Sequence, residues 1–391
     1  MVHAELDLTR ECIEGRIEYD GPASCPACGQ PSPKYDHRER RWRHLDLFQY
    51  AFYVTAQIPR VNCTDHGVVQ LSVPWAEGKS GFTALFERLA IALIRQMSLV
   101  AVARHLRISW DEVDGIMERA VARGLQRRTD RIYRFIGIDE KSIKKRHKYF
   151  TVVSDLQAGQ VIWIGRGRKQ EALDAFWRTL SVRQREGIEG IAMDMWLPFY
   201  ESTLAHVPGA KQKIVFDKFH IVKHLVDAVD ITRKQMLRDL GKDGAASLRG
   251  TKYDWLRNPH NMGHSDKIAL ARLRGEYEKL GRAWTIKELF SKLWDYHRES
   301  AARTFFDDWH GWAVRSRLPA IVSVAKMIKR HFENVITYLR LRITNAAAEG
   351  LNSKIQWIKY QARGFRNEDR FERAILFHCG GLDLLPTHSN S

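Results

Sequence analysis

Two short motifs near the start of the chain, each with two metal-ligand side chains, constrain the fold most strongly. Cys25 and Cys28 form a Cys-x2-Cys pair, and Cys63 and His66 form a Cys-x2-His pair. Zinc favours four thiolate and imidazole ligands, and a two-residue gap lets one tight turn aim both side chains at the same ion. A glycine follows each pair and can supply the left-handed backbone that such a turn often needs. We predict that these four residues bind a structural Zn²⁺; the alternative is that they are ordinary buried residues.

The segment between the two pairs is rich in arginine and aromatic residues. Phe48, Tyr50 and Phe52 alternate with other residues, and this period of two indicates a β-strand. A β-hairpin between two ligand pairs makes a zinc ribbon, which we expect to occupy residues 1–75. The basic strands of such a ribbon suit contacts with phosphates, and the candidate DNA-binding side chains here are Arg40, Arg41 and Arg43.

Helical periodicity begins after Pro74, with one apolar face over residues 82–97. Residues 98–113 then resemble a helix-turn-helix, because Ser98 can cap a first helix and Ser109 a second, with Glu112 placed to complete a capping box. We predict a helix-turn-helix DNA-binding domain at 76–132, whose second helix reads a DNA groove. Helical hairpins of this length also occur without DNA binding, so the motif alone leaves both interpretations open. The candidate DNA contacts are Arg104 and Arg107.

From residue 134 the pattern becomes a mixture of strands and helices. Three apolar runs, at 135–140, 149–155 and 160–165, predict an antiparallel meander, and helices and strands alternate from 170 to 216. We assign a mixed α/β core to residues 133–220 and 334–391. Residues 221–333 between these parts are helical by periodicity and carry five of the twelve tryptophans, so we predict an all-helical insertion in which most of these rings pack internally.

Three acidic residues stand out against this basic chain. Asp139 and Asp194 each follow an apolar strand, and α/β sheets build their sites at the carboxyl ends of strands. Glu349 lies on a predicted helix and shares one polar face with Asn352, Gln356 and Lys359. Carboxylates that converge repel one another unless a cation lies between them, and oxygen ligands suit Mg²⁺ or Mn²⁺. Taken singly, each acid would fit a solvated surface residue; their joint placement favours a site.

Further motifs occur in a consistent order along the chain. They are Gly137-Ile138-Asp139-Glu140, Met193-Asp194-Met195-Trp196, Asp217-Lys218-Phe219-His220, the run from Thr344 to Gln356, and Arg363-Gly364-Phe365-Arg366-Asn367. Together with the Cys25–Cys28 pair, they make nearly the whole chain resemble the DDE transposases of bacterial insertion sequences, specifically the ISL3 family. The resemblance implies a multidomain α+β protein with a zinc ribbon, a helix-turn-helix and an RNase H-like core that a helical insertion interrupts.

The resemblance also implies roles for individual residues. Asp139, Asp194 and Glu349 would be the catalytic triad that binds two Mg²⁺ or Mn²⁺ ions, and Asp217 and His220 would lie near the site as auxiliary residues. From the residues alone, His220 could orient a phosphate or a metal-bound water, or simply cap the following helix. The second ligand pair departs from the family, which often has Cys-x2-Cys where this chain has Cys63 and His66; zinc accepts either ligand.

The charge of the chain supports a polyanionic partner. Lysine and arginine number 63 against 46 acidic residues, which gives a formal net charge of +17. A generically basic surface is the alternative. Because the longest apolar run, at 89–94, falls far short of the ~20 residues of a membrane-spanning helix, we expect no membrane partner. The start of the chain shows no signal peptide, and five cysteines do not suit a disulfide framework, so we expect a bacterial cytoplasmic, nucleoid-associated protein.

The resulting hypothesis is a DNA transposase that binds the terminal inverted repeats of its own element. Metal-dependent phosphodiester cleavage would free a 3′-hydroxyl, which would attack a target phosphate. Double-stranded DNA is the expected partner, and holding two ends requires a homodimer or larger homo-oligomer. Further candidate backbone contacts are Lys144, Lys145, Arg146, Lys354 and Lys359. The alternatives are a zinc-containing, sequence-specific DNA-binding regulator without catalysis, and an RNase H-like nuclease or Holliday-junction resolvase.

Overall fold

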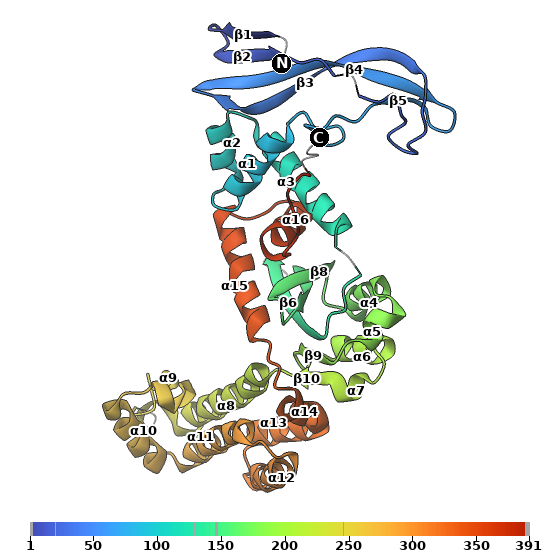
Figure 1. The fold of residues 1–391 in the computed structure, drawn as a ribbon. Coiled ribbons are helices and arrows are strands. Elements are labelled where there is room, and N and C mark those ends of the chain that lie inside the picture. The colour runs from blue at the N-terminus through green and yellow to red at the C-terminus, as the bar shows by residue number, and fades with distance from the viewer. Residues whose placement is uncertain (1–2, 20, 129, 145–147, 245, 388–391) are drawn as a thin grey trace. The chain divides into compact units, whose positions relative to one another are not determined.

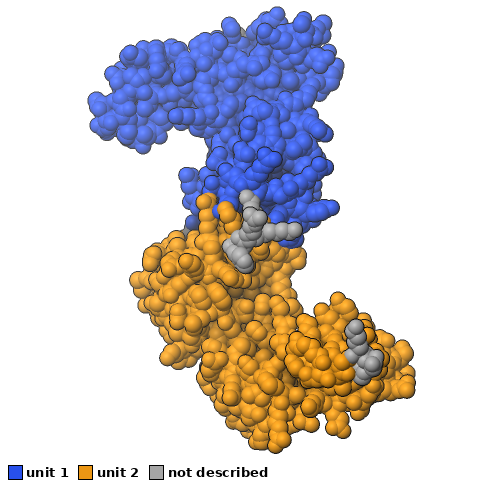
Figure 2. Space-filling model, turned by 180° about the vertical axis from the view of Figure 1, so that it is seen from behind, with its two compact units in different colours: residues 1–129, 355–391 blue, residues 130–354 orange. Residues whose placement is uncertain are grey.

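The computed structural model of the chain describes residues 3–19, 21–128, 130–144, 148–244 and 246–387 (Figure 1). The chain divides into two compact units, which Figure 2 colours separately: unit 1 comprises residues 1–129 and 355–391, and unit 2 comprises residues 130–354. Unit 1 holds the Cys and His pairs and the helix-turn-helix, and unit 2 holds the α/β sheet and the helical segment, so the chain is a multidomain α+β protein. The segment 334–391, which the sequence predicts to belong to the α/β core, is divided between the two units, because residues 355–391 group with the N-terminal part of the chain.

Unit 1 begins with a five-stranded sheet of order β1-β2-β4-β3, with β5 also paired to β4. Its long members, β3 and β4, form an antiparallel hairpin, as the sequence predicts between the two ligand pairs. Phe48 lies in the hairpin turn with a positive φ and is 86% exposed, so the strand alternation starts at Tyr50 and not at Phe48. Beyond it, alternate residues from Phe52 to Ile58 are buried, which explains the period of two. The strands are β1 (His3–Asp7), β2 (Cys12–Arg16), β3 (Lys34–Leu47), β4 (Tyr50–Cys63) and β5 (Gly67–Gln70).

The helix-turn-helix follows the sheet as α1 (Ala84–Ile94), α2 (Leu99–Leu106) and α3 (Trp110–Gln126). The Ser98 side chain accepts a hydrogen bond from the Ala101 amide and caps α2. Ser109 and Glu112 form the predicted capping box at the start of α3. Between the two helices, Arg107 adopts a left-handed backbone conformation that ends α2. Local capping chemistry therefore fixes the start of both helices and the turn between them.

The C-terminal helix α16 (Glu368–Cys379) packs against α3 within unit 1. Asn367 caps its start by accepting hydrogen bonds from two backbone amides of its first turn. On the α3 side, Arg373 pairs with Asp114 at 2.9 Å and with Glu118 at 2.8 Å, and Arg370 pairs with Asp114 at 3.2 Å. Charge pairing thus joins the end of the chain to the second helix of the helix-turn-helix.

Unit 2 contains a five-stranded sheet of order β10-β9-β6-β7-β8. β6, β7 and β8, the first three strands of the sheet along the chain, form the predicted antiparallel meander. β9 pairs parallel to β6, and β10 pairs parallel to β9. We expected the first strand to end at its acidic residues, but β6 continues beyond them because it pairs with β7 as far as Lys144. The strands are β6 (Phe135–Lys144), β7 (Lys148–Asp155), β8 (Gln160–Arg166), β9 (Gly190–Met193) and β10 (Ile214–Phe216).

Four short helices connect and flank the later strands of this sheet. From the sequence we also predict a strand over residues 210–216, the last in the alternation of helices and strands. This prediction is wrong in its first half, because residues 210–213 form a helical turn and only residues 214–216 form the strand. Gly209 turns the chain with a positive φ, and the Ala-Lys-Gln-Lys sequence after it has low strand propensity. The helices are α4 (Gln170–Thr179), α5 (Val182–Glu186), α6 (Leu197–His206) and α7 (Ala210–Lys213).

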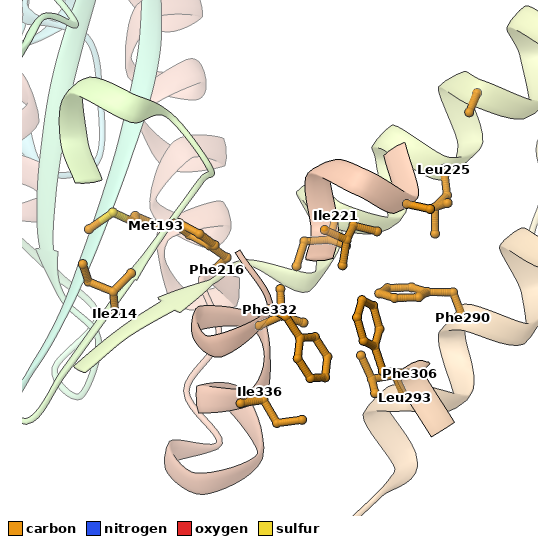
Figure 3. Close-up of a cluster of buried hydrophobic side chains, with 14 of the residues drawn as sticks. Met193, Ile214, Phe216, Ile221, Leu225, Phe290, Leu293, Phe306, Phe332 and Ile336 are labelled. Atoms are coloured by element: carbon orange, nitrogen blue, oxygen red, sulfur yellow. The ribbon is translucent and has the colours of Figure 1, made fainter. Parts of the chain in front are cut away.

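The segment after β10 is all helical, as its periodicity predicts, and shares its core with the sheet. Figure 3 shows Met193 and Phe216 from the sheet beside Ile221, Phe332 and Phe306 from the helices, within one continuous cluster of buried side chains. Trp255 and Trp309 are fully buried, and the other three tryptophans pack against this core. The helices are α8 (Lys218–Gly244), α9 (Lys252–Leu256), α10 (His264–Glu276), α11 (Glu278–Ser291), α12 (Glu299–Arg315), α13 (Pro319–Arg330) and α14 (Phe332–Leu341), with 3₁₀ turns η1 (Pro259–Asn261) and η2 (Lys292–Asp295).

Helix α15 (Ala346–Gln361) begins in unit 2 and continues into unit 1. Leu351, Ile355 and Ile358 are buried, while Glu349 is exposed on the opposite, polar face that the sequence predicts. Within the described part of the chain, no helix is both long and apolar enough to cross a membrane.

Candidate active site and zinc site

The Cys25, Cys28, Cys63 and His66 side chains come together at one end of the β3–β4 hairpin, with all four ligand atoms within 4.8 Å of one another. The Cys28 and Cys63 sulfurs are 3.7 Å apart, and Nδ1 of His66 lies 3.7 Å from the Cys25 sulfur and 3.6 Å from the Cys63 sulfur. A tetrahedral zinc ion with ordinary Zn–S and Zn–N bonds requires S···S and S···N separations of about 3.8 and about 3.6 Å. The four residues therefore fit a structural Zn²⁺.

The backbone around each ligand pair has the geometry that the sequence predicts. The Gly29 amide donates to the Cys25 carbonyl at 2.8 Å, and both Gly29 and Gly67 have positive φ angles. Hydrogen bonds from His66 and from the Asp65 amide lower the pKa of the Cys63 thiol to about 6, which favours the thiolate that zinc binds. Cys12 and Cys379, which have no partner at ligand spacing in the sequence, are buried elsewhere in the fold.

Three aspartates of unit 2 align across the three parallel strands of its sheet. Ile138 pairs with Met193, and Met193 pairs with Phe216, in register across β6, β9 and β10. Asp139, Asp194 and Asp217 each follow directly after a member of this row. The sheet therefore brings the two predicted catalytic aspartates together and adds Asp217 beside them.

The two predicted catalytic aspartates are held by backbone and side-chain donors. The Oδ1 atoms of Asp139 and Asp194 accept hydrogen bonds from the next backbone amide in the chain, at 2.7 and 2.6 Å respectively. The other oxygen of Asp139 accepts from the side-chain amide of Asn352 on α15. Asn352 lies three residues after Glu349 on the same helix, so one helical turn supplies both the third acid and a donor to the first.

His220 lies between two of the carboxylates at the start of α8. Its Nδ1 atom is 3.4 Å from Oδ2 of Asp194, and its Nε2 atom is 3.9 Å from Oδ2 of Asp217. Asp217 is 95% buried, and its Oδ2 atom has no hydrogen-bond partner among the described residues. His220 is thus placed to face Asp194 and Asp217 at once, and Asp217 keeps an acceptor atom available.

The carboxylates of this cluster repel one another electrostatically. Burial raises the pKa of Asp139, and the nearby charge of Asp194 raises it further. Burial likewise raises the pKa of Asp217, with additional contributions from Glu349 and Asp139. Glu349 is therefore within electrostatic range of Asp217 although it belongs to a different element. Such mutual repulsion is the property that a bound cation would relieve.

The zinc ligands are the one group in the described part of the chain that brings three or more metal-ligand atoms within 4.8 Å of each other. Asp139, Asp194 and Glu349 do not form such a group among the described residues.

Two further side chains border the acids and were not singled out from the sequence. Glu140 follows Asp139, and burial together with the charges of Asp139 and Asp194 raises its pKa, while Arg168 opposes this effect. The Arg168 guanidinium lies 3.5 Å from the Glu140 carboxylate and packs over the rings of Tyr149 and Trp196. Arg168 follows a glycine at the end of β8, a position that periodicity does not connect with Asp139.

The predicted DNA-contacting side chains fall into four groups. Arg43 is 96% buried and pairs with Asp46, which argues against a phosphate contact for this residue. Partners within unit 1 also engage Arg40, Arg41 and Arg107, although Arg41 and Arg107 remain partly exposed. Arg104 and Lys354 are exposed, and Lys359 is half-buried. The Lys144 side chain, Lys145 and Arg146 lie outside the described residues.

A zinc-binding, helix-turn-helix unit and an acidic α/β site together define an enzyme that acts on DNA. Comparison with known proteins agrees. Residues 136–375 match the ISL3 family model described as a transposase, residues 71–121 match the helix-turn-helix domain of transposase family ISL3, and residues 21–66 match the zinc finger of the transposases of IS204, IS1001, IS1096 and IS1165.

Two relatives cover most of the chain. The transposase for insertion sequence element IS1557 of Mycobacterium tuberculosis is 29% identical over 394 residues, covering 94% of this chain and 88% of that protein. The transposase for IS1001 of Bordetella parapertussis is 27% identical over 353 residues, covering 89% and 86%. The chain belongs to the ISL3 family of DDE transposases and is a DNA transposase with a DNA-binding helix-turn-helix domain. The predicted family and enzyme class are confirmed.

Proposed function

We propose that Asp139, Asp194 and Glu349 are the catalytic carboxylates with which this transposase cleaves DNA at the ends of its element and joins the freed ends to a target. The observation that carries the proposal is the register of β6 and β9, which sets Asp139 beside Asp194, with Glu349 within electrostatic range of the cluster. Asp217 and His220 are auxiliary residues in this proposal.

The residues of the cluster fit two divalent ions of the Mg²⁺ or Mn²⁺ type. The donor set is made of carboxylate oxygens, which these hard cations prefer. Asp139 and Asp217 have raised pKa values because burial and neighbouring acids disfavour their charged forms. The buried Oδ2 atom of Asp217 lacks a hydrogen-bond partner among the described residues, and this supports an additional ligand or water near it. Asp139, Asp194 and Glu349 would hold the ions.

When bound, such ions supply an activated oxygen nucleophile and stabilise the leaving oxygen of an in-line phosphoryl transfer. The residues of the chain supply orientation. Asn352 donates to Asp139 and fixes the direction of its carboxylate, and the amides of Glu140 and Met195 do the same for the Oδ1 atoms of Asp139 and Asp194. His220, facing Asp194 and Asp217, can hold a proton between them or orient a phosphate oxygen.

We infer that unit 2 is an RNase H-like core with a helical insertion. The antiparallel strands β6, β7 and β8 are followed along the chain by the parallel strands β9 and β10, and their order in the sheet is β10-β9-β6-β7-β8. This arrangement supports the inference. The helices from α8 to α14 interrupt the core between β10 and α15, the element that carries Glu349. Their continuous packing with Phe216 and Met193 indicates that the insertion also supports the strand ends that carry the aspartates.

We infer that the zinc ribbon and helix-turn-helix of unit 1 bind the terminal inverted repeats. Arg41, Arg104 and Arg107 keep exposed surface that suits phosphate contacts. Two ends must be held together for joining, so a homodimer or larger homo-oligomer is the expected active form. With bacterial DNA as its substrate, the protein would act in the cytoplasm at the nucleoid.

The experiment that tests this function uses a supercoiled plasmid that carries the DNA flanking the coding region, with a second plasmid as target. We expect Mg²⁺-dependent cleavage at the element ends and joining of the cleaved 3′ ends to the target plasmid. Binding to the ends without any nicking would favour a regulator and contradict the proposal. Cleavage without joining would favour a nuclease or resolvase and contradict the strand-transfer step.

A further inference from the structure

A cavity of about 690 Å³ opens within unit 1 between the helix-turn-helix and the segment that joins α15 to α16. One side is lined by Met97, Val100 and Arg104, around the start of α2 and along it. The other side is lined by Arg363, Phe365 and Arg366, while Trp110 and Met117 of α3 also line it. We call this cavity the C-terminal groove. Two segments about 250 residues apart in the sequence therefore build it together.

The groove combines an apolar lining with a positively charged rim. Ile94, Leu99, Ile358 and Ala374 add to its apolar surface, and its charged residues are Arg104, Arg363, Arg366, Arg370 and Asp114. Asp114 is the one acid among the described residues that line the groove, and Arg370 and Arg373 pair with it. Arg104, Arg363 and Arg366 are exposed. The groove therefore attracts an anion that also carries apolar surface.

A second cavity of about 670 Å³ shares Gln361, Arg363 and Gly364 with the C-terminal groove. Its other lining residues include Lys359 and Tyr360 of α15, and the Tyr360 side chain is 83% exposed. Exposed aromatic rings beside basic side chains are typical of surfaces that bind single-stranded nucleic acid, because bases stack on the rings and phosphates meet the charges. The basic surface thus continues from the groove along the end of α15.

We propose that the C-terminal groove binds an unpaired nucleotide of the DNA strand held by unit 1, with the base against the apolar lining and the phosphate on Arg363 and Arg366. The volume of the groove lies within the ~300–1,000 Å³ range of small-molecule pockets. The groove is therefore large enough for a nucleotide but too small for a duplex. The adjoining Tyr360 is placed to stack the next base along the strand. The segment after α15, which lies in the transposase domain by sequence, then contributes to DNA binding.

This inference rests on the DNA-binding part of the proposed function and can fail separately from it. The test measures binding without Mg²⁺, whereas cleavage and joining are measured with Mg²⁺ on the plasmid substrate. The probes are a blunt duplex of 30 base pairs from an element end and the same duplex with a single-stranded tail of four thymidines. We expect the wild-type protein to bind the tailed probe about tenfold more tightly, the value of roughly one stacked base. Equal affinities for the two probes would overturn the proposal.

Two variants separate the charge of the groove from its apolar lining. The Arg363→Ala/Arg366→Ala variant removes both arginines that hold the phosphate, so the slope of log affinity against log salt on the tailed probe should fall by about 1. The matched control, Arg178→Ala/Arg183→Ala, removes the same charge from exposed positions of α4 and α5 and should leave the slope unchanged. An unchanged slope in the groove variant would contradict the assignment of these arginines.

The Val100→Trp variant fills the groove without changing its charge. Val100 is 49% exposed at the start of α2, so the larger side chain can enter the groove without disrupting the core of unit 1. We expect this variant to lose the preference for the tailed probe while it keeps wild-type affinity and the wild-type salt slope on the blunt duplex. Circular dichroism and zinc content confirm that the variant is folded. A retained preference for the tailed probe would overturn the placement of the base in the groove.

Discussion

The contact between Asn352 and Asp139 makes a sharp prediction about catalysis, because it joins the helix that carries Glu349 to the strand that carries the first aspartate. Replacing Asn352 by alanine removes a hydrogen bond from a neutral amide to a carboxylate, which is worth about 1.5–3 kcal/mol. If the bond serves to orient Asp139, its loss raises the activation free energy of cleavage by the whole of this amount. At a factor of ten for each 1.4 kcal/mol, the expected loss of end cleavage is roughly 10- to 100-fold.

The assay measures the rate of end cleavage on the supercoiled plasmid as a function of Mg²⁺ concentration, together with the affinity for the element end. Asn352→Ala should keep its DNA affinity and require more Mg²⁺ for half-maximal cleavage. Asn352→Asp should lose more activity than the alanine variant, because it sets a further negative charge against Asp139. The control is Ser353→Ala, whose hydroxyl bonds only to the Glu349 carbonyl of its own helix in the described structure.

Cleavage by Asn352→Ala within twofold of the wild-type rate would refute this reasoning. It would mean that Asp139 is oriented well enough by the Glu140 amide alone, or that Asp139 is not a catalytic ligand. Equal losses in Asn352→Ala and Ser353→Ala would instead indicate a general disturbance of α15. Thermal unfolding of all three variants distinguishes a folding defect from a change at the site.

Three further predictions concern the zinc site, pH and packing. Cys63→Ser should abolish stoichiometric zinc binding and expose residues 1–75 to limited proteolysis, because the metal joins two chain segments that share only a small core. Full zinc content in this variant would contradict the ligand assignment. Burial lowers the pKa of His378 from 6.5 to about 4, so the free energy of unfolding should fall by about 3 kcal/mol as the pH drops from 6.5 to 4. Urea unfolding of His378→Gln should lack this pH dependence. Gly137→Ala would bring a Cβ atom to 2.7 Å from side-chain atoms of Leu156 and Ser154, so urea unfolding should show a free energy of unfolding lower by about 1–3 kcal/mol. The control is Gly275→Ala, whose Cβ atom would lie in open space and should not destabilise the protein.

Features determined by local sequence could be predicted. The spacing of Cys25, Cys28, Cys63 and His66 is itself the geometry of two tight turns, and the ligand atoms meet as expected. The capping box at Ser109 and Glu112 depends on residues three apart, so the start of α3 was predicted correctly. The period of two along β4 depended only on which face of the hairpin is buried.

Features determined by distant parts of the chain could not be predicted from patterns. The alignment of Asp217 with Asp139 and Asp194 depends on the order of three parallel strands, which periodicity does not give. The burial of Arg43 depends on the packing of β3 against α1, and its sequence neighbours suggested only a basic strand.

The pairing of α16 with α3 joins residues separated by more than 250 positions, and the charges of Arg373 and Asp114 give no sign of it in the sequence. For the same reason the C-terminal groove was not anticipated. Motifs of the transposase family placed the end of the chain in the catalytic core, and only the packing of α16 reveals its association with the helix-turn-helix.

The most direct test of the proposed catalytic triad compares Asp194→Asn with wild type for affinity and cleavage on the same element end in Mg²⁺. The control is Asp308→Asn, which removes one negative charge from an exposed position of α12. We predict that both variants bind the end with wild-type affinity and that Asp308→Asn cleaves at the wild-type rate. Asp194→Asn should lose more than about 100-fold in cleavage rate, since a direct metal ligand contributes at least as much as a residue that hydrogen-bonds to a ligand. Full cleavage by Asp194→Asn would contradict the assignment, and loss of binding together with cleavage would show that Asp194 serves the fold and not the chemistry.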